Sequence, residues 1–344
     1  MSRQKLTVVL SQAQGKNPTK RALEESIVAA LLLEPGLDVS VVPHLYDLDA
    51  AHTGRLFLES IQGDMIVLAW LFPRAAFWVL DRDGIRGHFG ESQLKPPSDD
   101  DDDEETKEPE PPKGIGSNGV PDRWIYCLDL RDFGSHDVYV QEVKRVAAEC
   151  AERRQANLKQ WIQGSPTMVQ LGRYLREDEP VTSIQPRFTA EDLLRAPERR
   201  WYPVIDYSRC TICMECLDFC LLGVYGVDKL ERISVESQDN CKRGCPACSR
   251  VCPEHAIMFP DYKSPAIAGA PVGAASSLKI DLTKLFGGDD AIKIAAQERD
   301  RELVNDGRAA VGLTVGIAKR QQDKPKGPKD DLDNLMDALD ALDI

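Results

Sequence analysis

Eight cysteines fall within one short stretch of the chain, and their spacing constrains the fold more than any other feature of the sequence. The chain has 344 residues and 10 cysteines, of which Cys127 and Cys150 stand alone. The other eight are Cys210, Cys213, Cys216, Cys220, Cys241, Cys245, Cys248 and Cys252. Because no export signal precedes this dense group, it indicates metal ligation in a reducing compartment rather than a disulfide framework.

Each half of this group contains three cysteines close together and a fourth after three further residues. A cubane iron–sulfur cluster binds four thiolates, and the run C-x2-C-x2-C-x3-C-P is one way in which a chain supplies them. Structural zinc sites usually take two C-x2-C pairs separated by a longer loop. The two runs fit zinc poorly, so we favour iron–sulfur chemistry, with two clusters rather than one.

The same residues give the chain a specific resemblance to bacterial-type two-cluster ferredoxins over residues 201–262. The first run reads CTICMECLDFC over residues 210–220, and the second reads CKRGCPACSRVCP over residues 241–253. The resemblance implies a small α+β ferredoxin-like domain with two [4Fe–4S] clusters, in which the fourth cysteine of each run binds the other cluster. The implied ligands are Cys210, Cys213, Cys216 and Cys252 for the first cluster, and Cys241, Cys245, Cys248 and Cys220 for the second.

Two positions depart from the ferredoxin pattern. Leu221 follows Cys220 where the family usually has proline, and three residues instead of two separate Cys241 from Cys245. Neither change removes a sulfur ligand, because proline only helps to turn the chain. The stretches that follow the two runs, 221–227 and 253–259, also match each other as small, apolar, strand-like tails. The ferredoxin fold implies such an internal symmetry, and we keep eight ligands.

Predicted strands and helices alternate over residues 1–90 and 121–165. Apolar runs predict strands at Leu6–Leu10, Val39–Val42, Met65–Phe72 and Trp124–Leu130. Helices are predicted after Asn17-Pro18, at His52–Ile61, from Pro73 and at Val138–Leu158, the first because asparagine caps a helix that proline can begin. Such alternation predicts an α/β domain with a parallel sheet, of flavodoxin-like or Rossmann-like type.

The remaining segments are polar or charged. Residues 91–120 form an acidic, proline-rich insertion that we expect to be disordered, and residues 166–200 form a polar connector. Residues 263–344 are an extended C-terminal region with a predicted helix at Asp289–Asn305 and an acidic amphipathic helix at its end. The net charge of −13 belongs to these segments, because residues 99–110 carry nine acids against one lysine and residues 330–344 carry six aspartates. The rest is near neutral and lacks the basic footprint of nucleic-acid binding.

No segment of the sequence predicts a membrane span or an export signal. The longest apolar run, Met65–Leu80, contains Pro73 and Arg74 and is shorter than the about 20 residues that cross a bilayer. Residues 1–10 lack the apolar region and cleavage site of a signal peptide. We therefore expect a cytoplasmic protein without membrane insertion.

Loops at the carboxyl ends of strands are where parallel sheets bind ligands. The candidate loops are Ser11–Asn17, His44–Asp49, Trp70–Arg74 and Asp129–Phe133. The first is suggestive of a phosphate loop but matches neither the P-loop nor the G-x-G-x-x-G pattern. We therefore favour a structural or docking role for the α/β domain over a flavin or nucleotide site. The two lone cysteines are predicted to be buried structural thiols.

These patterns favour an electron-transfer protein that relays single electrons through two [4Fe–4S] clusters to or from a redox partner protein. The alternative is the iron–sulfur subunit of an oxidoreductase complex, with a cofactor or partner site in the α/β domain. A third hypothesis is a scaffold in which the clusters only hold the fold together. The sequence assigns no catalytic residue and no catalysed reaction.

Overall fold

The computed structural model of the protein describes residues 5–94, 114–116, 119–162, 197–229, 231–271 and 289–316. Most of the predicted acidic insertion and most of the predicted connector lie outside the described residues, and so does the predicted terminal amphipathic helix. The predicted disorder of the insertion is therefore left as a prediction.

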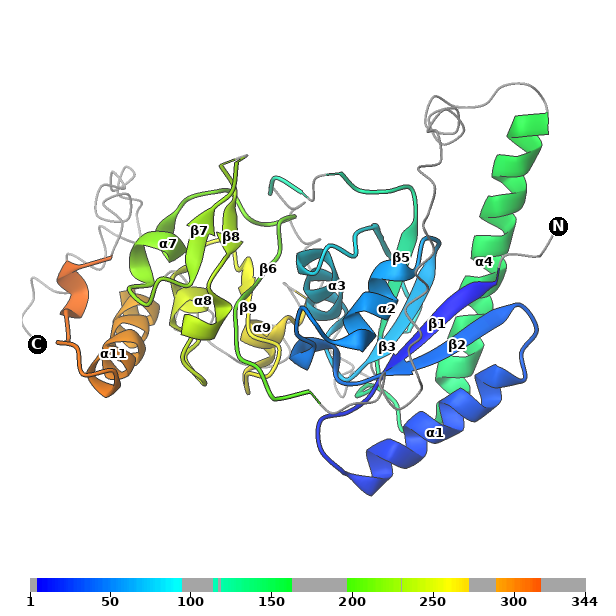
Figure 1. The fold of residues 1–344 in the computed structure, drawn as a ribbon, viewed down its shortest axis with the longest axis horizontal. Helices are drawn as coiled ribbons and strands as arrows, with labels where there is room; N and C mark the ends of the chain where they lie inside the picture. Colours follow the sequence, from blue (N-terminus) through cyan, green and yellow to red (C-terminus); the bar gives the residue numbers. More distant parts are fainter. Residues whose placement is uncertain are drawn as a thin grey trace, which may run out of the picture.

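Five strands form a parallel sheet in the order β2-β1-β3-β5-β4 (Figure 1). The strands are β1 Leu6–Ser11, β2 Leu37–Val42, β3 Met65–Ala69, β4 His88–Gly90 and β5 Trp124–Asp129. The α/β class and the four predicted strands are confirmed. The sequence does not predict β4, because three residues are too few to show a period.

Four helices accompany these strands. They are α1 Pro18–Leu32, α2 Thr53–Ser60, α3 Pro73–Arg82 and α4 His136–Ile162. The start of α1 is confirmed in detail, because the side chain of Asn17 accepts hydrogen bonds from the backbone N–H groups of Thr19 at 3.0 Å and Lys20 at 3.3 Å. Among the described residues, no helix combines the length and apolar character needed to cross a membrane.

Helices cover both faces of the sheet (Figure 1). On one face, Ile27 of α1 and Val143 of α4 join one apolar cluster with residues of β1, β3 and β5. On the other face, Leu58 of α2 and Leu80 of α3 join a second apolar cluster, which also takes in residues from beyond position 200. The second cluster is therefore shared by the sheet and the cysteine-rich part of the chain.

Residues 201–262, here called the cysteine segment, form two antiparallel strand pairs and two short helices. The elements are β6 Val204–Ile205, α7 Glu215–Phe219, β7 Tyr225–Val227, β8 Ile233–Val235, α8 Ala247–Val251 and β9 Ile257–Met258. β6 pairs with β9, and β7 pairs with β8. The segment is followed by the short α9 Pro265–Ala268 and by α11 Asp289–Asn305, which has the predicted bounds.

The cysteine segment lies against the carboxyl ends of the sheet strands. The hydroxyl of Tyr46, in the loop after β2, donates to the carbonyl oxygen of Tyr202 at 2.5 Å and accepts from its N–H at 2.8 Å. Arg74, at the start of α3, donates to the Asp206 carboxylate at 2.5 Å. Both tyrosines are buried, so the two parts of the molecule share one packed joint.

A short stretch from the end of the acidic insertion also contacts the cysteine segment. The backbone N–H groups of Gly114, Ile115 and Gly116 donate to the carbonyl oxygens of Ser208, Cys210 and Tyr207, at 2.7, 3.1 and 2.8 Å respectively. A Cβ atom at Gly114 would collide with the carbonyl of Ser208, so this approach requires glycine. Residues 114–116 therefore lie directly beside the loop that carries Cys210.

The joint predicts the effect of changing Tyr46→Phe. The change leaves the N–H and carbonyl of Tyr202 without their buried partner, which costs about 1–3 kcal/mol of the free energy of unfolding. Chemical denaturation measures the loss. Tyr126→Phe is the control, and we expect a smaller loss there, because its partners Glu149 and Arg153 are partly exposed and regain bonds from water. Equal losses in the two variants would contradict the assignment.

Candidate metal centres

Four cysteines from two parts of the cysteine segment surround one cavity. The first cavity encloses about 350 Å³ of space between its atoms, part of it open to solvent. Isoleucines 205, 233 and 257 contribute apolar walls. We call its thiols the first cysteine group: Cys210, Cys213, Cys216 and Cys252.

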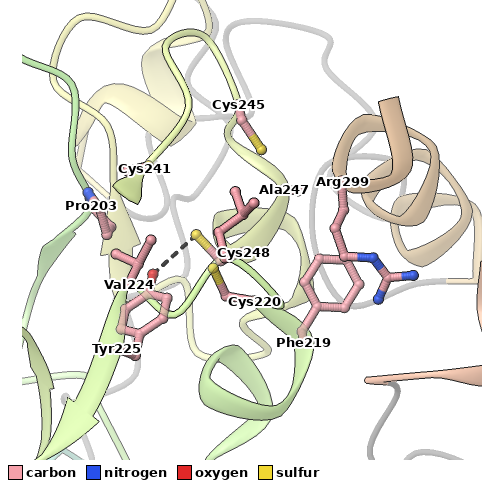
Figure 2. Close-up of a pocket in the computed structure, with 11 residues that line it drawn as sticks. Pro203, Phe219, Cys220, Val224, Tyr225, Cys241, Cys245, Ala247, Cys248 and Arg299 are labelled. Carbon is pink, nitrogen blue, oxygen red and sulfur yellow. Dashed lines mark hydrogen bonds between the residues drawn. The ribbon is translucent and has the colours of Figure 1, made fainter. Parts of the chain in front are cut away.

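The other four cysteines surround a second cavity (Figure 2). It encloses about 340 Å³, again partly open to solvent, and Phe219, Val224 and Ala247 contribute apolar walls. Its thiols are the second cysteine group: Cys220, Cys241, Cys245 and Cys248. Each group thus takes three neighbouring cysteines from one run and the last cysteine from the other run.

The short helices α7 and α8 explain why each group includes the last cysteine of the other run. Cys216 lies in the first turn of α7 and Cys220 is the residue at which that helix ends. Cys248 and Cys252 occupy the matching places on α8. The spacing of four residues is about one helical turn, so the two thiols of a pair lie on the same side of the helix, displaced along its axis. The displacement carries Cys220 and Cys252 to the cavity of the opposite group.

Left-handed backbone positions shape the loops around the thiols. Ile212, with φ 56°, directly precedes Cys213, and Gly244, with φ 86°, directly precedes Cys245. Both runs therefore share a left-handed position before their second cysteine, and the extra residue between Cys241 and Cys245 lies before that position. The matching residues Gly223 and His255 have φ 69° and 53°, and each follows the last cysteine of its run by three positions.

Backbone N–H groups point at most of the sulfurs. Cys252 Sγ accepts from the N–H of Ala256 at 3.3 Å. The N–H groups of Leu222 and Val224 bind Cys220 in the same way that those of Glu254 and Ala256 bind Cys252. Hydrogen bonds to a sulfur stabilise it as a thiolate, which is the form that ligates metal. This donor pattern fits a group held by thiolates.

Tyr225 supplies a side-chain donor to the second group. Its hydroxyl donates to Cys248 Sγ at 3.0 Å, as Figure 2 shows, and its side chain is buried. Burial raises the pKa of the Cys245 thiol to about 12 and that of the Cys252 thiol to about 11. Within the described ranges, no three histidine, cysteine or carboxylate side chains come close enough to bind a single metal ion. The sulfurs are instead spread around cavities.

The two lone cysteines lie away from both cavities. Cys127, on β5, and Cys150, on α4, are each at most 1% exposed within the two apolar clusters of the sheet. Burial raises the pKa of the Cys150 thiol to about 11. Their predicted place in the core is confirmed.

The side chain of Glu24 lies against the candidate loop Ser11–Asn17 that follows β1. Glu24 is 3% exposed and accepts hydrogen bonds from the N–H of Ala13 at 2.6 Å and from Nε1 of Trp70 at 2.8 Å. Arg21 donates to its other oxygen at 2.7 Å. These three donors are therefore engaged by the chain itself, in agreement with a structural role for the loop.

A polar cavity of about 880 Å³, open to solvent, lies where the loop after β2 meets the second cysteine group. Asp47 and Asp49 line it from the loop, and Arg199, Arg243 and Cys241 line it from the other side. Burial raises the pKa of Asp47 to about 6. At this cavity the α/β part of the chain therefore lies close to Cys241 of the second cysteine group.

Comparison with known proteins identifies a ferredoxin segment in the chain. Over 84 residues the chain is 39% identical to a protein of Methanocaldococcus jannaschii described as an uncharacterized ferredoxin. The match covers 24% of this chain and 56% of that protein, so the chain spans little more than half the length of this relative. No known protein family and no solved structure matches the chain. The similarity supports iron–sulfur chemistry and electron transport for the matching segment.

The sequence predicts the eight cysteines that surround the cavities but does not predict two of their neighbours. Nothing in the sequence indicates that the hydroxyl of Tyr225 binds a cysteine sulfur. Arg299, which lines the second cavity, belongs to α11 and lies outside the cysteine segment. No local pattern connects it to the cysteines.

The left-handed turn after Cys220 predicts the effect of Gly223→Ala. A Cβ atom there meets nothing closer than 3.9 Å, so the change tests backbone strain alone. We expect the free energy of unfolding to fall by about 1–2 kcal/mol, because a left-handed conformation disfavours residues with a side chain. Gly134→Ala, also in open space but without a positive φ, is the control and should leave stability unchanged or slightly raised. Thermal denaturation of both variants decides between these outcomes.

Proposed function

We propose that the protein is an electron-transfer protein that holds two [4Fe–4S] clusters. The first is assigned to Cys210, Cys213, Cys216 and Cys252, and the second to Cys241, Cys245, Cys248 and Cys220. The observation that carries the proposal is the pair of cavities, each surrounded by four thiols that combine three cysteines of one run with the last cysteine of the other. The ferredoxin relative supports the same chemistry.

When bound, such clusters each accept and release one electron at a potential that the protein environment sets. The chain's own residues supply the four thiolates at each site and the backbone N–H groups that stabilise them. Apolar walls such as Ile257 and Val224 limit the access of water. No catalysed reaction is included in the proposal; the substrate chemistry belongs to a redox partner protein, in a reducing, cytoplasmic setting.

Metal analysis and one ligand variant test this proposal. Protein purified without oxygen should contain about eight irons and eight sulfides per chain. Cys213→Ala removes one thiolate of the first group, so we expect loss of that cluster and about half of the iron, with the spectrum of the second retained. Electron paramagnetic resonance after dithionite reduction distinguishes the two sites.

Cys127→Ala is the matched control, because this cysteine is buried in the sheet core away from both cavities. It should retain all the iron and sulfide. A wild-type protein that contains zinc and no acid-labile sulfide would contradict the proposal. Equal loss of iron in the two variants would remove the ligand assignment.

A second candidate function is that of an iron–sulfur subunit that receives a partner or cofactor at the polar cavity beside Cys241. The observation that favours it is that Asp47 and Asp49 of the α/β part line the same cavity as Cys241. Charges of both signs line the cavity, so it offers partners to a polar or charged group: Arg199, Arg200, Arg243, Asp47, Asp49, Glu198 and Asp239.

Exchange of electrons with small charged oxidants tests this candidate. The double variant Arg199→Gln, Arg243→Gln should slow oxidation of the reduced protein by anionic ferricyanide by about tenfold at low salt. The rate with a cationic cobalt(III) hexaammine should rise instead, since the local potential becomes more negative. Stopped-flow absorbance measures both rates. Unchanged rates with both oxidants would show that electrons do not pass this cavity.

A further inference from the structure

The C-terminal part of the described chain lies across the second cysteine group. Ala295 of α11 packs with Phe219, Ala247 and Val251 of the cysteine segment in one apolar cluster that borders Cys245. Figure 1 shows α11 beside α8, at the end of the molecule away from the sheet. The second cavity therefore has a wall from outside the cysteine segment.

Two ion pairs and one hydrogen bond hold this wall in place. Arg250 of α8 donates to both carboxylate oxygens of Glu298, at 2.9 and 3.2 Å. Lys242 binds Asp306 at 2.6 Å, and Arg308 donates to the carbonyl of Leu221 at 2.8 Å. Leu221 directly follows Cys220 and Lys242 directly follows Cys241, so the wall is bound next to a cysteine of each run.

Arg299 stands at the centre of this wall. Its side chain is 2% exposed, and its guanidinium donates to the carbonyls of Gly312 at 2.6 Å and Val315 at 2.8 Å. The guanidinium also lies over the ring of Phe219, 4.6 Å from its centroid. Arg299 lines the second cavity, and Figure 2 shows Phe219 between it and the thiols of Cys220 and Cys248.

The first cavity is lined differently. Among the described residues that line it, the one charged side chain is Glu254. Two nearby cations do not line it: Arg74 interacts electrostatically with Cys252 but is paired with the Asp206 carboxylate, and Arg209 donates to the carbonyl of Glu254. A buried cation thus lines one cavity and a carboxylate lines the other.

α11 also brings carboxylates close to the second group. Asp300 accepts from Nε of Arg299 at 3.0 Å and from the N–H of Gly312 at 2.6 Å. The carboxylates of Glu298 and Glu302 interact electrostatically with Cys245, and Glu298 forms an ion pair with Arg250. Of these charged groups, Arg299 alone lines the cavity.

We propose that Arg299 is a positioning residue that raises the reduction potential of the second cluster site alone and so draws a shared electron toward that site. The inference rests on the proposed function. Reduction adds one negative charge to the site that receives the electron, and a cation with little solvent around it stabilises that charge strongly. When the electron moves from the first site to the second, the first is oxidised by one electron, the second is reduced by one, and no proton or bond changes.

The test is a potentiometric titration of the loaded protein followed by electron paramagnetic resonance. Arg299→Met keeps the length of the side chain and removes its charge. We expect the potential of one of the two sites to fall by at least about 59 mV, a tenfold change in a one-electron equilibrium, while the other stays in place. Entry of water into the cavity would instead raise the potential, because water favours the more highly charged reduced form. The sign therefore separates an electrostatic role from a structural one.

Three further variants keep the inference testable if Arg299→Met does not fold. Arg299→Lys retains a charge and should restore most of the potential. Asp300→Asn removes the opposing carboxylate and should raise the same potential that Arg299→Met lowers. Glu254→Gln should raise the potential of the other site. Arg308→Met, an exposed arginine of the same wall that does not line the cavity, is the control and should move neither potential.

Iron and sulfide analysis of each variant comes first and separates the two proposals. A wild-type protein with fewer than two clusters would end the proposed function and this inference with it. Two intact clusters with an unchanged or raised potential in Arg299→Met would overturn the inference alone. Equal shifts of both sites, or equal effects of Arg299→Met and Arg308→Met, would overturn it as well.

Discussion

The need to bring four thiols to one cavity, twice, is the constraint on which the structure of the cysteine segment depends. Each helix carries one thiol toward its own group and one toward the other, so neither cavity is complete without both runs. Left-handed residues before Cys213 and Cys245 turn the chain tightly enough to present successive thiols. Backbone N–H groups released by these turns then bind sulfur instead of carbonyl oxygen. The left-handed turns and the gathering of the thiols are thus two aspects of one arrangement.

The α/β part of the chain supports this segment at the place where such sheets usually bind ligands. Its loops after β2 and β3 contribute Tyr46 and Arg74 to a buried joint with the cysteine segment. The loop after β1 is closed by Glu24. The carboxyl edge of the sheet therefore serves mainly as an interface inside the chain, with the polar cavity beside Cys241 at its margin.

Local patterns predicted the elements of the α/β part well, and contacts between distant residues were beyond them. The Asn17-Pro18 start of α1 and the bounds of α11 were readable because caps and periodicity act within a few residues. The resemblance to two-cluster ferredoxins implied the crossed grouping in which the thiols surround the two cavities. β4 has too few residues for a pattern. The sequence does not distinguish Glu24 from the exposed acids of a helix, and only the fold shows that it is buried. Arg299 acts across the fold on a run far upstream, and its role depends on tertiary packing alone.

The three backbone hydrogen bonds between residues 114–116 and the loop of Cys210 link the insertion to the first cysteine group mechanically. They hold residues 114–116 beside the loop of Cys210. A partner protein that binds the acidic residues of the insertion would therefore bind only a few residues along the chain from this contact. The most highly charged stretch of the chain is thereby tethered within a few residues of a sulfur atom.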